Sequence, residues 1–167
     1  NITGSIFFGC TNLKEINIDS DNSNYVVSDG VLFDKAMTTI IKYPAAKDGT
    51  AYIVPKNIVS IGENAFANCS GFEYQYKLDI PDSVTKIGEN AFASSNMYIT
   101  RYTENNSNIE MVDDWIVAGD DFFKSQEINF AVRGIADGAY KEKEITDLVL
   151  PDEVEYIGES AFQDCRI

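Results

Sequence analysis

The stretch Ile80–Phe92, IPDSVTKIGENAF, decides the fold, because versions of it recur along the chain. The other copies are VPKNIVSIGENAF (Val54–Phe66), INFAVRGIADGAY (Ile128–Tyr140) and LPDEVEYIGESAF (Leu150–Phe162). Each copy has aliphatic side chains at its first, fifth and eighth positions, and a small residue precedes an aromatic residue at its end. The chain is therefore built from repeats of one short unit.

The eighth-position isoleucines set the repeat length. Ile61, Ile87, Ile135 and Ile157 lie 26, 48 and 22 residues apart, so the middle gap holds two units and the chain about six or seven. Periods of about 20 to 29 residues are typical of solenoids, in which each unit buries its apolar side against the next. We therefore expect continuous columns of aliphatic and aromatic residues, each buried side chain contributing about 1.5–3 kcal/mol.

Glycine and proline occupy fixed places in the unit. Gly62, Gly88 and Gly158 follow the eighth position, whereas Ala136 stands there in the third copy. Such a glycine serves either a turn with positive φ or a close approach of neighbouring backbones. The proline at the second position of the same three copies cannot donate a ladder hydrogen bond, which predicts that a strand ends there.

The unit I-P-x-x-V-x-x-I-G-x-x-A-F-x-x-C resembles the leucine-rich repeats of the BspA-like (Treponema-type) surface proteins, over nearly the whole chain. The resemblance implies a β-rich leucine-rich-repeat solenoid: stacked coils of short parallel strands with turns and short helical segments, plus hairpin-like insert coils. It also implies a bacterial cell-surface or secreted protein that acts in adhesion or host interaction.

We expect residues 1–167 to form a single solenoid domain. The opening NITGSIFFGC matches the repeat ending SIGENAFANC, and the chain closes within another repeat, at AFQDCRI. This pattern predicts a fragment of a longer chain, with neighbouring repeats of the parent protein as partners. Open ends of a repeat array otherwise need caps or a partner.

Residues 25–52 depart from the repeat. Val31–Phe33 and Thr39–Tyr43 are apolar runs typical of strands, joined through Asp34 and Lys35, and they predict a hairpin-like coil within the stack. The BspA-like proteins carry similar DGVLF inserts between ordinary repeats. We find no chemical motif in this segment.

The segment 72–80, FEYQYKLDI, alternates apolar and polar residues and predicts a strand. If Ile80 points inward, the polar side chains lie on the exposed sheet face, a surface that repeat proteins commonly use for binding. We therefore take these four as candidate binding residues, with an ordinary solvated sheet as the alternative: Glu73, Gln75, Lys77 and Asp79.

Residues 97–127 are the least regular part of the chain, and Glu104–Glu127 carries seven acidic residues against one basic residue. Trp115, the only tryptophan, follows an acid pair and is a further candidate for a carbohydrate or cation contact. The alternative is that Trp115 supplies the apolar content of a variant coil.

A polar loop, DSDNSN at Asp19–Asn24, begins like a calcium-binding loop. Its sixth position is Asn24 rather than glycine and its twelfth is Gly30 rather than glutamate, so a simple turn is the competing interpretation.

Composition excludes several functions. The net charge is −14, which argues against nucleic acid and anionic membranes as partners, because both select basic surfaces. No apolar run exceeds four residues, so no membrane-spanning helix is expected. The chain has no histidine, which removes histidine-based triads and histidine metal sites. We expect no cofactor and no metal site.

Cys10, Cys69 and Cys165 follow the aromatic residue of their units at one offset. They should share one column but lie whole coils apart, which makes a disulfide unfavourable. We expect three buried, inert thiols.

These observations favour a non-enzymatic extracellular domain that binds a protein or a surface glycan, of a kind the sequence does not identify. The first alternative is a structural spacer that displays another domain of the parent protein. A second is a carbohydrate-active enzyme that uses acids near Trp115, although acids are too common here to single out a pair.

Overall fold

The computed structural model describes residues 2–49, 51–72, 77–97, 100–102, 109–119, 125–128, 130–145 and 147–166. A 3₁₀ turn, η1 (Gly4–Phe7), opens the chain. The strands of the N-terminal part are β1 (Tyr25–Ser28), β2 (Val31–Asp34), β3 (Thr39–Lys42), β4 (Ser60–Ile61) and β5 (Lys86–Ile87). Those of the C-terminal part are β6 (Thr100–Tyr102), β7 (Ile109–Val112), β8 (Trp115–Ala118), β9 (Ser125–Glu127), β10 (Gly134–Ile135), β11 (Asp147–Val149) and β12 (Tyr156–Ile157).

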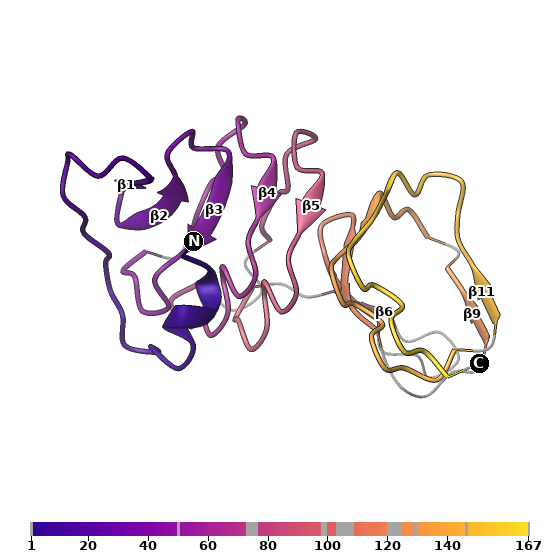
Figure 1. Ribbon diagram of the computed structural model, residues 1–167. Helices are drawn as coiled ribbons and strands as arrows, with labels where there is room; N and C mark the ends of the chain where they lie inside the picture. The colour runs from indigo at the N-terminus through magenta and orange to yellow at the C-terminus, as the bar shows by residue number, and fades with distance from the viewer. Residues whose placement is uncertain are drawn as a thin grey trace.

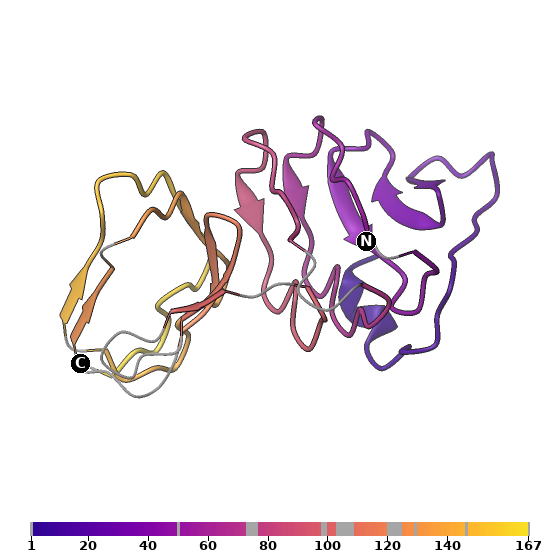
Figure 2. The same cartoon turned by 180° about the vertical axis from the view of Figure 1, so that it is seen from behind.

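The described strands form two five-stranded sheets built on the same plan. The N-terminal sheet has the order β1-β2-β3-β4-β5 and the C-terminal sheet the order β12-β10-β8-β7-β6. Taken in chain order, each sheet begins with two antiparallel pairings and continues with two parallel pairings. A separate parallel pair joins β9 and β11. Figures 1 and 2 show the two arrays beside one another, with β5 as the last rung of the N-terminal array.

The predicted isoleucine columns are present within each sheet. Ile40 lies opposite Ile61, which lies opposite Ile87. In the C-terminal sheet Ile135 lies between Ile116 and Ile157. Ile116 therefore belongs to the extra unit expected in the middle gap. Apart from Ile157, these column residues are buried, because parallel rungs superimpose each inward side chain on its counterpart.

Aromatic side chains form a second set of columns. The rings of Tyr43 and Phe66 stack with centroids 5.3 Å apart, and those of Phe66 and Phe92 with centroids 5.4 Å apart. Tyr140 and Phe162 repeat this arrangement at 5.3 Å. Such pairs add about 0.5–1.5 kcal/mol beyond the area that they bury, so the aromatic residue of each repeat stabilises the stacking directly.

The repeat glycines serve close backbone approach and not positive φ. A Cβ atom on Gly88 would lie 2.4 Å from the Glu63 nitrogen, and one on Gly158 would lie 2.4 Å from the Asp137 nitrogen. Positive φ occurs instead two residues later, for example at Asn64 and Asn90. The glycine at this position therefore sets the distance between neighbouring repeats.

The repeat prolines begin turns, so our prediction that they mark strand ends is wrong for Pro55 and Pro81. The carbonyl oxygen of each of these prolines accepts a hydrogen bond from the backbone nitrogen three residues later. Pro151 makes the same turn, but it also lies two residues after the end of β11, as predicted. The turn brings the fifth-position residue into the core before the short strand begins.

The insert at residues 25–52 folds as predicted, because β2 and β3 pair antiparallel. The sequence did not indicate β1, which pairs with β2 across a turn at Asp29 and Gly30, both with positive φ. The C-terminal array places β7 and β8 in the same way, with positive φ at Asp113. Hairpins therefore open both sheets.

A buried lysine lies where β3 ends. Lys42 is 2% exposed, and its Nζ donates hydrogen bonds to the carbonyl oxygens of Asn64, at 2.9 Å, and Ala67, at 3.1 Å. Burial lowers the pKa of Lys42. The ammonium group satisfies two turn carbonyls of the next repeat.

Among the described residues no strand pairs with the far side of β5. The two sheets are joined there mainly by contacts of side chains. We call this contact the seam. On one side it consists of residues 80–89, and on the other side of Asp113, Arg133, Asp137 and Lys141. Lys86 lies 3.1 Å from a carboxylate oxygen of Asp137, and this hydrogen bond, opposed only in part by desolvation, raises the pKa of Lys86. One backbone bond also crosses, from the Asp137 nitrogen to the Ile87 oxygen at 2.8 Å.

Arg133 makes the most seam contacts among these residues. Its guanidinium binds both carboxylate oxygens of Asp114, at 2.7 and 3.3 Å. It also donates to four backbone oxygens across the seam, those of Ile80, Pro81, Asp82 and Val84, at 3.0–3.5 Å. Burial opposes the charge, but the hydrogen bonds and charge of Asp114 outweigh it, so the pKa of Arg133 is raised.

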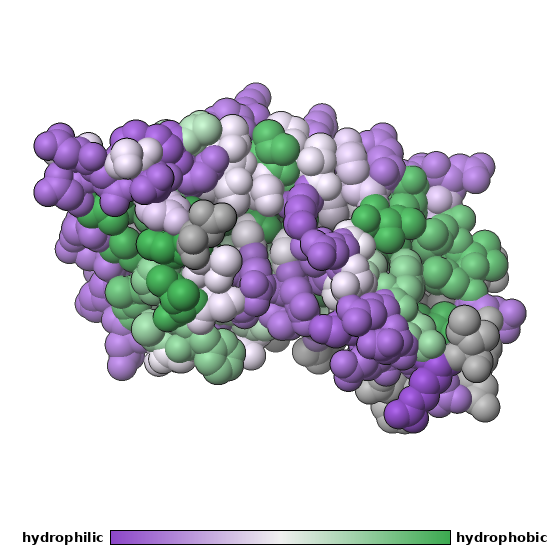
Figure 3. All heavy atoms as spheres, viewed as in Figure 1, coloured by the Kyte–Doolittle hydropathy of each residue, from purple (hydrophilic) through white to green (hydrophobic). Residues whose placement is uncertain are grey.

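Apolar side chains are exposed at both ends of the described chain. Ile6 and Phe8 are 61% and 77% exposed, and Val149 and Ile157 are 58% and 55% exposed. Figure 3 shows hydrophobic surface toward both sides of this view, with hydrophilic side chains between. Ile157 is exposed although its column partners are buried, because no described repeat covers it.

Candidate functional site

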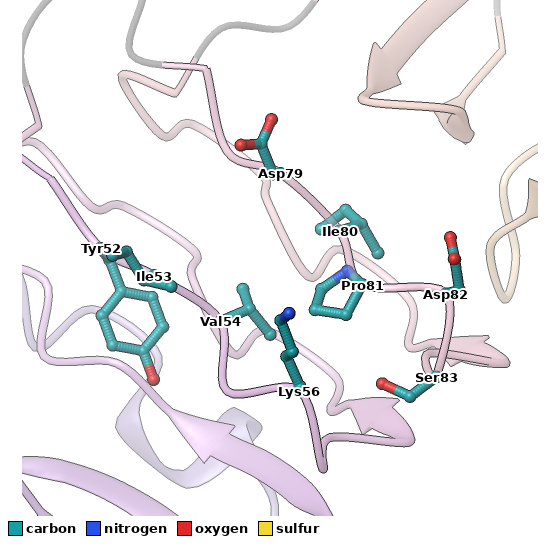
Figure 4. Close-up of a pocket in the computed structure, with 9 residues that line it drawn as sticks. All are labelled: Tyr52, Ile53, Val54, Lys56, Asp79, Ile80, Pro81, Asp82 and Ser83. Carbon is teal, nitrogen blue, oxygen red and sulfur yellow. The ribbon is translucent and has the colours of Figure 1, made fainter.

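A groove lies where two consecutive repeats begin. We call it the Ile53 groove; its volume is about 560 Å³, and it is lined by Tyr52, Ile53, Val54, Lys56, Asp79, Ile80, Pro81, Asp82 and Ser83 (Figure 4). Its two walls are the segments that precede β4 and β5. Because the repeats are in register, equivalent residues of the two walls face the groove together.

Hydrogen bonds hold the wall at residues 79–83 in place. The Ile80 nitrogen donates to a carboxylate oxygen of Asp113 at 2.8 Å, and Arg133 binds the carbonyl oxygens of the next residues. The hydroxyl of Ser83 donates to the Ile58 oxygen at 2.7 Å, which links the two walls. The groove is therefore preformed, as small-molecule and peptide sites usually are.

The groove has an apolar centre and a polar rim. Val54 and Ile80 are buried beneath it, whereas Ile53 is 86% exposed. Lys56, Asp79 and Asp82 supply exposed charges of both signs. An aliphatic side chain so exposed gains about 1.5–3 kcal/mol when a partner covers it. The chemistry fits a protein contact with an apolar anchor and flanking ion pairs.

The structure places two of the four predicted sheet-face residues, Lys77 and Asp79, differently from our expectation. Lys77 and Asp79 are exposed, as the alternation predicted, and their charged groups lie 3.9 Å apart. However, residues 77–80 form no strand, so these two side chains do not lie on a sheet face. Asp79 lines the Ile53 groove instead. Glu73 and Gln75 lie outside the described residues.

Trp115 is buried, with 1% of its surface exposed. Gly134 lies between Trp115 and Tyr156 in the parallel ladder. The rings of Trp115 and Tyr156 stack over this glycine, with centroids 5.9 Å apart and 6° between their planes. Arg133 lies 5.7 Å from the Trp115 ring. Burial favours the interpretation of Trp115 as core of a variant coil and not as a surface contact for a ligand.

Ile53 was not among the predicted site residues. The only sequence signal is the run Tyr52-Ile53-Val54, which places three apolar residues where alternation would leave the middle one outside. A single outward isoleucine is common on protein surfaces, so only the neighbouring wall identifies it as part of a groove.

The loop at Asp19–Asn24 is a set of side-chain-capped turns. Asp19 accepts a hydrogen bond from the Asp21 nitrogen, and Asn22 accepts from the nitrogens of Asn24 and Tyr25, each at 2.9 Å. These oxygens thus serve the backbone, in the manner of Asx turns. Across the ranges given above, no group of three or more acidic or cysteine side chains is arranged to hold a metal ion.

The cysteines do not share one environment, so the prediction of three buried thiols is wrong. Cys69 is buried, Cys165 is half-buried and Cys10 is exposed. Cys69 and Cys165 do occupy equivalent places, since their Sγ atoms contact the carbonyl oxygens of Tyr43 and Tyr140. The N-terminal segment packs against Glu63 through Gly4 and Ser5, and its Cys10 makes no such contact among the described residues.

We expect one thiol to react rapidly in the folded protein. Burial raises the pKa of Cys69 to about 12, so this thiol carries almost no reactive thiolate near neutral pH. A maleimide added at pH 7 should modify Cys10 within minutes and Cys165 more slowly, with Cys69 reacting only in denaturant. Mass spectrometry of the peptides measures the order, and rapid modification of Cys69 without denaturant would contradict the assigned burial.

The described helix content consists of one short 3₁₀ turn, and no helix among these residues is long and apolar enough to cross a membrane. Short parallel rungs, turns at repeat prolines and columns of isoleucine and phenylalanine define a leucine-rich repeat protein. The family model described as BspA type leucine-rich repeat region matches residues 45–167 in six copies. The chain belongs to this family.

Solved structures agree at the level of the fold. A leucine-rich repeat protein from Eubacterium ventriosum is 18% identical, with a TM-score of 0.50 over 94% of this chain and 54% of its own length. The pneumococcal vaccine antigen PcpA is 21% identical, with a TM-score of 0.50 over 91% of this chain and 47% of its own length. The chain thus spans about half the length of these two relatives.

A third structure, a leucine-rich cell surface protein from Faecalibacterium prausnitzii, is 27% identical. Its TM-score is 0.47, over 87% of this chain and 38% of that protein. No curated protein matches the sequence at a significant level.

Proposed function

We propose that this chain is a non-enzymatic domain, exposed at a cell surface or secreted, that binds another protein through the Ile53 groove. The observation that carries the proposal is the groove itself, where Ile53 is 86% exposed between charged residues of both signs. Family membership supports a protein-binding role at a surface, and the Faecalibacterium relative is described as a cell surface protein. The repeats would then act as one solenoid domain that presents the groove.

A spacer that displays another domain is the second candidate. The stacking of both sheets on the same plan favours it, because a rigid array of repeats serves equally well to hold a separate domain away from its anchor. A surface glycan is the alternative ligand for the groove, since its rim carries carboxylates and a lysine.

The test is binding of the purified chain to extracellular matrix proteins, mucins and glycans at physiological salt. Ile53→Asp should weaken a protein interaction by about tenfold to a hundredfold, because it removes an apolar anchor worth about 1.5–3 kcal/mol. Charge reversal at Lys77 and Asp79 should change affinity less, since rim charges contribute mainly to association rate.

The matched control is Val59→Asp, which changes a 43% exposed aliphatic residue that does not line the groove. Equal loss with both variants would reject the groove as the site. Absence of saturable binding across the panel would favour the spacer.

A further inference from the structure

Each repeat turn carries a row of backbone amides on alternate residues. In the repeat before β5 these amides donate to carbonyl oxygens of the next repeat: Asn64 to Glu89 at 3.1 Å, Phe66 to Ala91 at 2.7 Å and Asn68 to Ala93 at 2.9 Å. The last two repeats are joined in the same way, by bonds from Gly138 to Glu159, Tyr140 to Ala161 and Glu142 to Gln163 at 2.8–3.0 Å. The row is therefore the standard backbone connection between repeats.

The equivalent amides of the repeat after β5 belong to Asn90, Phe92 and Ser94. Asn90 and Ser94 have φ values of 56° and 54°, close to the 54° and 61° of Asn64 and Asn68. The rings of Phe66 and Phe92 are nearly parallel, at 8°. Equal conformation means that these three N–H groups point away from the preceding repeat, just as the earlier row does. Within the described part of the chain, none of the three donates a hydrogen bond.

A cavity lies on the side to which these amides point. Its volume is about 370 Å³, and one wall consists of residues 90–95. The opposite wall is formed by Glu110 of β7 and by Val117 and Ala118 of β8. The hydroxyl of Ser95, on the amide wall, is buried and has no hydrogen-bond partner. We call this cavity the amide pocket.

The amide pocket exists because the seam holds the two sheets together without a ladder between β5 and β8. Arg133 and Lys86 fix the two arrays by side-chain bonds on the strand side of the repeat. The turn side is thereby left with a row of donors and space in front of them. Asn90 and Ser94 are exposed, whereas Phe92 is buried. Backbone donors without a protein partner are satisfied by water or by a ligand.

We propose that the amide pocket binds the backbone of a segment from a partner polypeptide that folds into the same turns as residues 88–94. The protein itself shows which group satisfies such a row: three carbonyl oxygens on alternate residues of a neighbouring chain segment. A polypeptide in this turn conformation supplies acceptors at that spacing, because every residue carries a backbone carbonyl group. The carboxylate of Glu110 on the facing wall and the net charge of −14 disfavour an inorganic anion.

The binding is separate from the proposed function of the Ile53 groove, because the two sites share no lining residue. The pocket lies at the low end of the usual volume range for ligand sites, roughly 300–1,000 Å³. It therefore accommodates a few residues of a polypeptide and not a folded domain.

The first measurement is amide hydrogen exchange of the whole ¹⁵N-labelled chain. The amides of Asn90, Phe92 and Ser94 should exchange at least about 100-fold faster than those of Asn64, Phe66 and Asn68, because the latter are hydrogen-bonded in the stack. The slow row also reports that the protein is folded. Equal protection of both rows would overturn the proposal, because the donors would already be satisfied.

The second measurement adds a ligand. The probe is a blocked peptide with the sequence IGENAFAS, which copies residues 87–94, the segment whose carbonyl oxygens satisfy the preceding row. Saturable downfield shifts of the three free amide protons, with slower exchange, are the expected result. Ala118→Leu, which fills the pocket, should abolish the shifts, and Ser95→Ala should weaken binding several-fold. Ser70→Ala, an exposed serine outside the pocket, is the matched control and should leave binding unchanged.

Sulfate and phosphate at the same concentrations separate the ligand classes. Shifts produced by these anions and not by the peptide would overturn the proposal, as would the absence of saturation with the peptide. Persistence of the peptide shifts in Ala118→Leu would also reject the pocket as the site.

Discussion

Ile87→Asp should abolish the stability of the N-terminal sheet. Ile87 is 1% exposed and lies opposite Ile61 in the column of parallel rungs. The substitution removes about 1.5–3 kcal/mol of apolar burial, and burying a carboxyl group without a partner costs roughly 2–7 kcal/mol more. The loss is comparable with the whole stability of a domain of this kind, about 5–15 kcal/mol. Urea unfolding followed by circular dichroism measures it.

The isoleucine column of the C-terminal sheet contains the control. Ile157 occupies the equivalent position of the last described repeat but is 55% exposed. A carboxylate there keeps contact with water, so Ile157→Asp should cost about 1 kcal/mol or less. Equal losses in the two variants would show that position within the repeat, and not burial, sets the cost. An unchanged melting temperature for Ile87→Asp would contradict the register of the repeats.

Arg133→Met should be the most damaging substitution of a charged residue at the seam. It leaves Asp114 without its partner and removes donors from carbonyl oxygens of residues 80–84. We expect a loss of about 2–4 kcal/mol, since removal of one partner of a partly buried charged network leaves the others unsatisfied. The flexible methionine retains part of the packing against Trp115, so the loss reports mainly on the hydrogen bonds.

Arg133→Lys separates charge from geometry. A lysine keeps the charge but lacks the planar fork that serves Asp114 and several carbonyl oxygens at once, so the loss should be close to that of Arg133→Met. Arg166→Met is the control and should cost less than about 0.5 kcal/mol, because Arg166 is exposed and its side chain forms no ion pair with the residues that the structure describes. If Arg133→Met costs no more than the control, the guanidinium does not hold the seam.

The hydrophobic spacing predicted the repeats well because it reflects a local requirement. An aliphatic residue at the fifth and eighth positions must be buried wherever a rung stacks, so Ile61, Ile87 and Ile135 could be identified without a structure. Ile116 was missed as an anchor because its unit lacks the ending with a small residue and an aromatic residue. Only its pairing beside Ile135 shows that it continues the pattern.

The candidate sites could be predicted only in part. Asp79 was found because alternation separates inward from outward side chains, but alternation does not reveal whether the segment joins a sheet. The seam left no sequence signal, since Arg133 binds backbone oxygens about 50 positions earlier and a carbonyl oxygen is present at every residue. The burial of Trp115 depends on Gly134 and Tyr156 beside it, a relation that appears only once the register is known.

Each sheet opens with a hairpin and continues with two parallel rungs. This shared plan limits how the length of such a chain can change during evolution. Ile40 and Ile116 hold the same place in the two arrays and lie 76 residues apart. Duplication or deletion of a whole array, or of one complete rung, leaves every column intact, because each rung offers the same surface to both neighbours. An insertion within a rung moves isoleucines out of the core, whereas the segments between rungs accommodate different lengths, since Ile61 and Ile87 lie 26 residues apart and Ile135 and Ile157 lie 22 apart. Length in this lineage should therefore vary by whole repeats and in the segments between rungs, while the rungs keep their length.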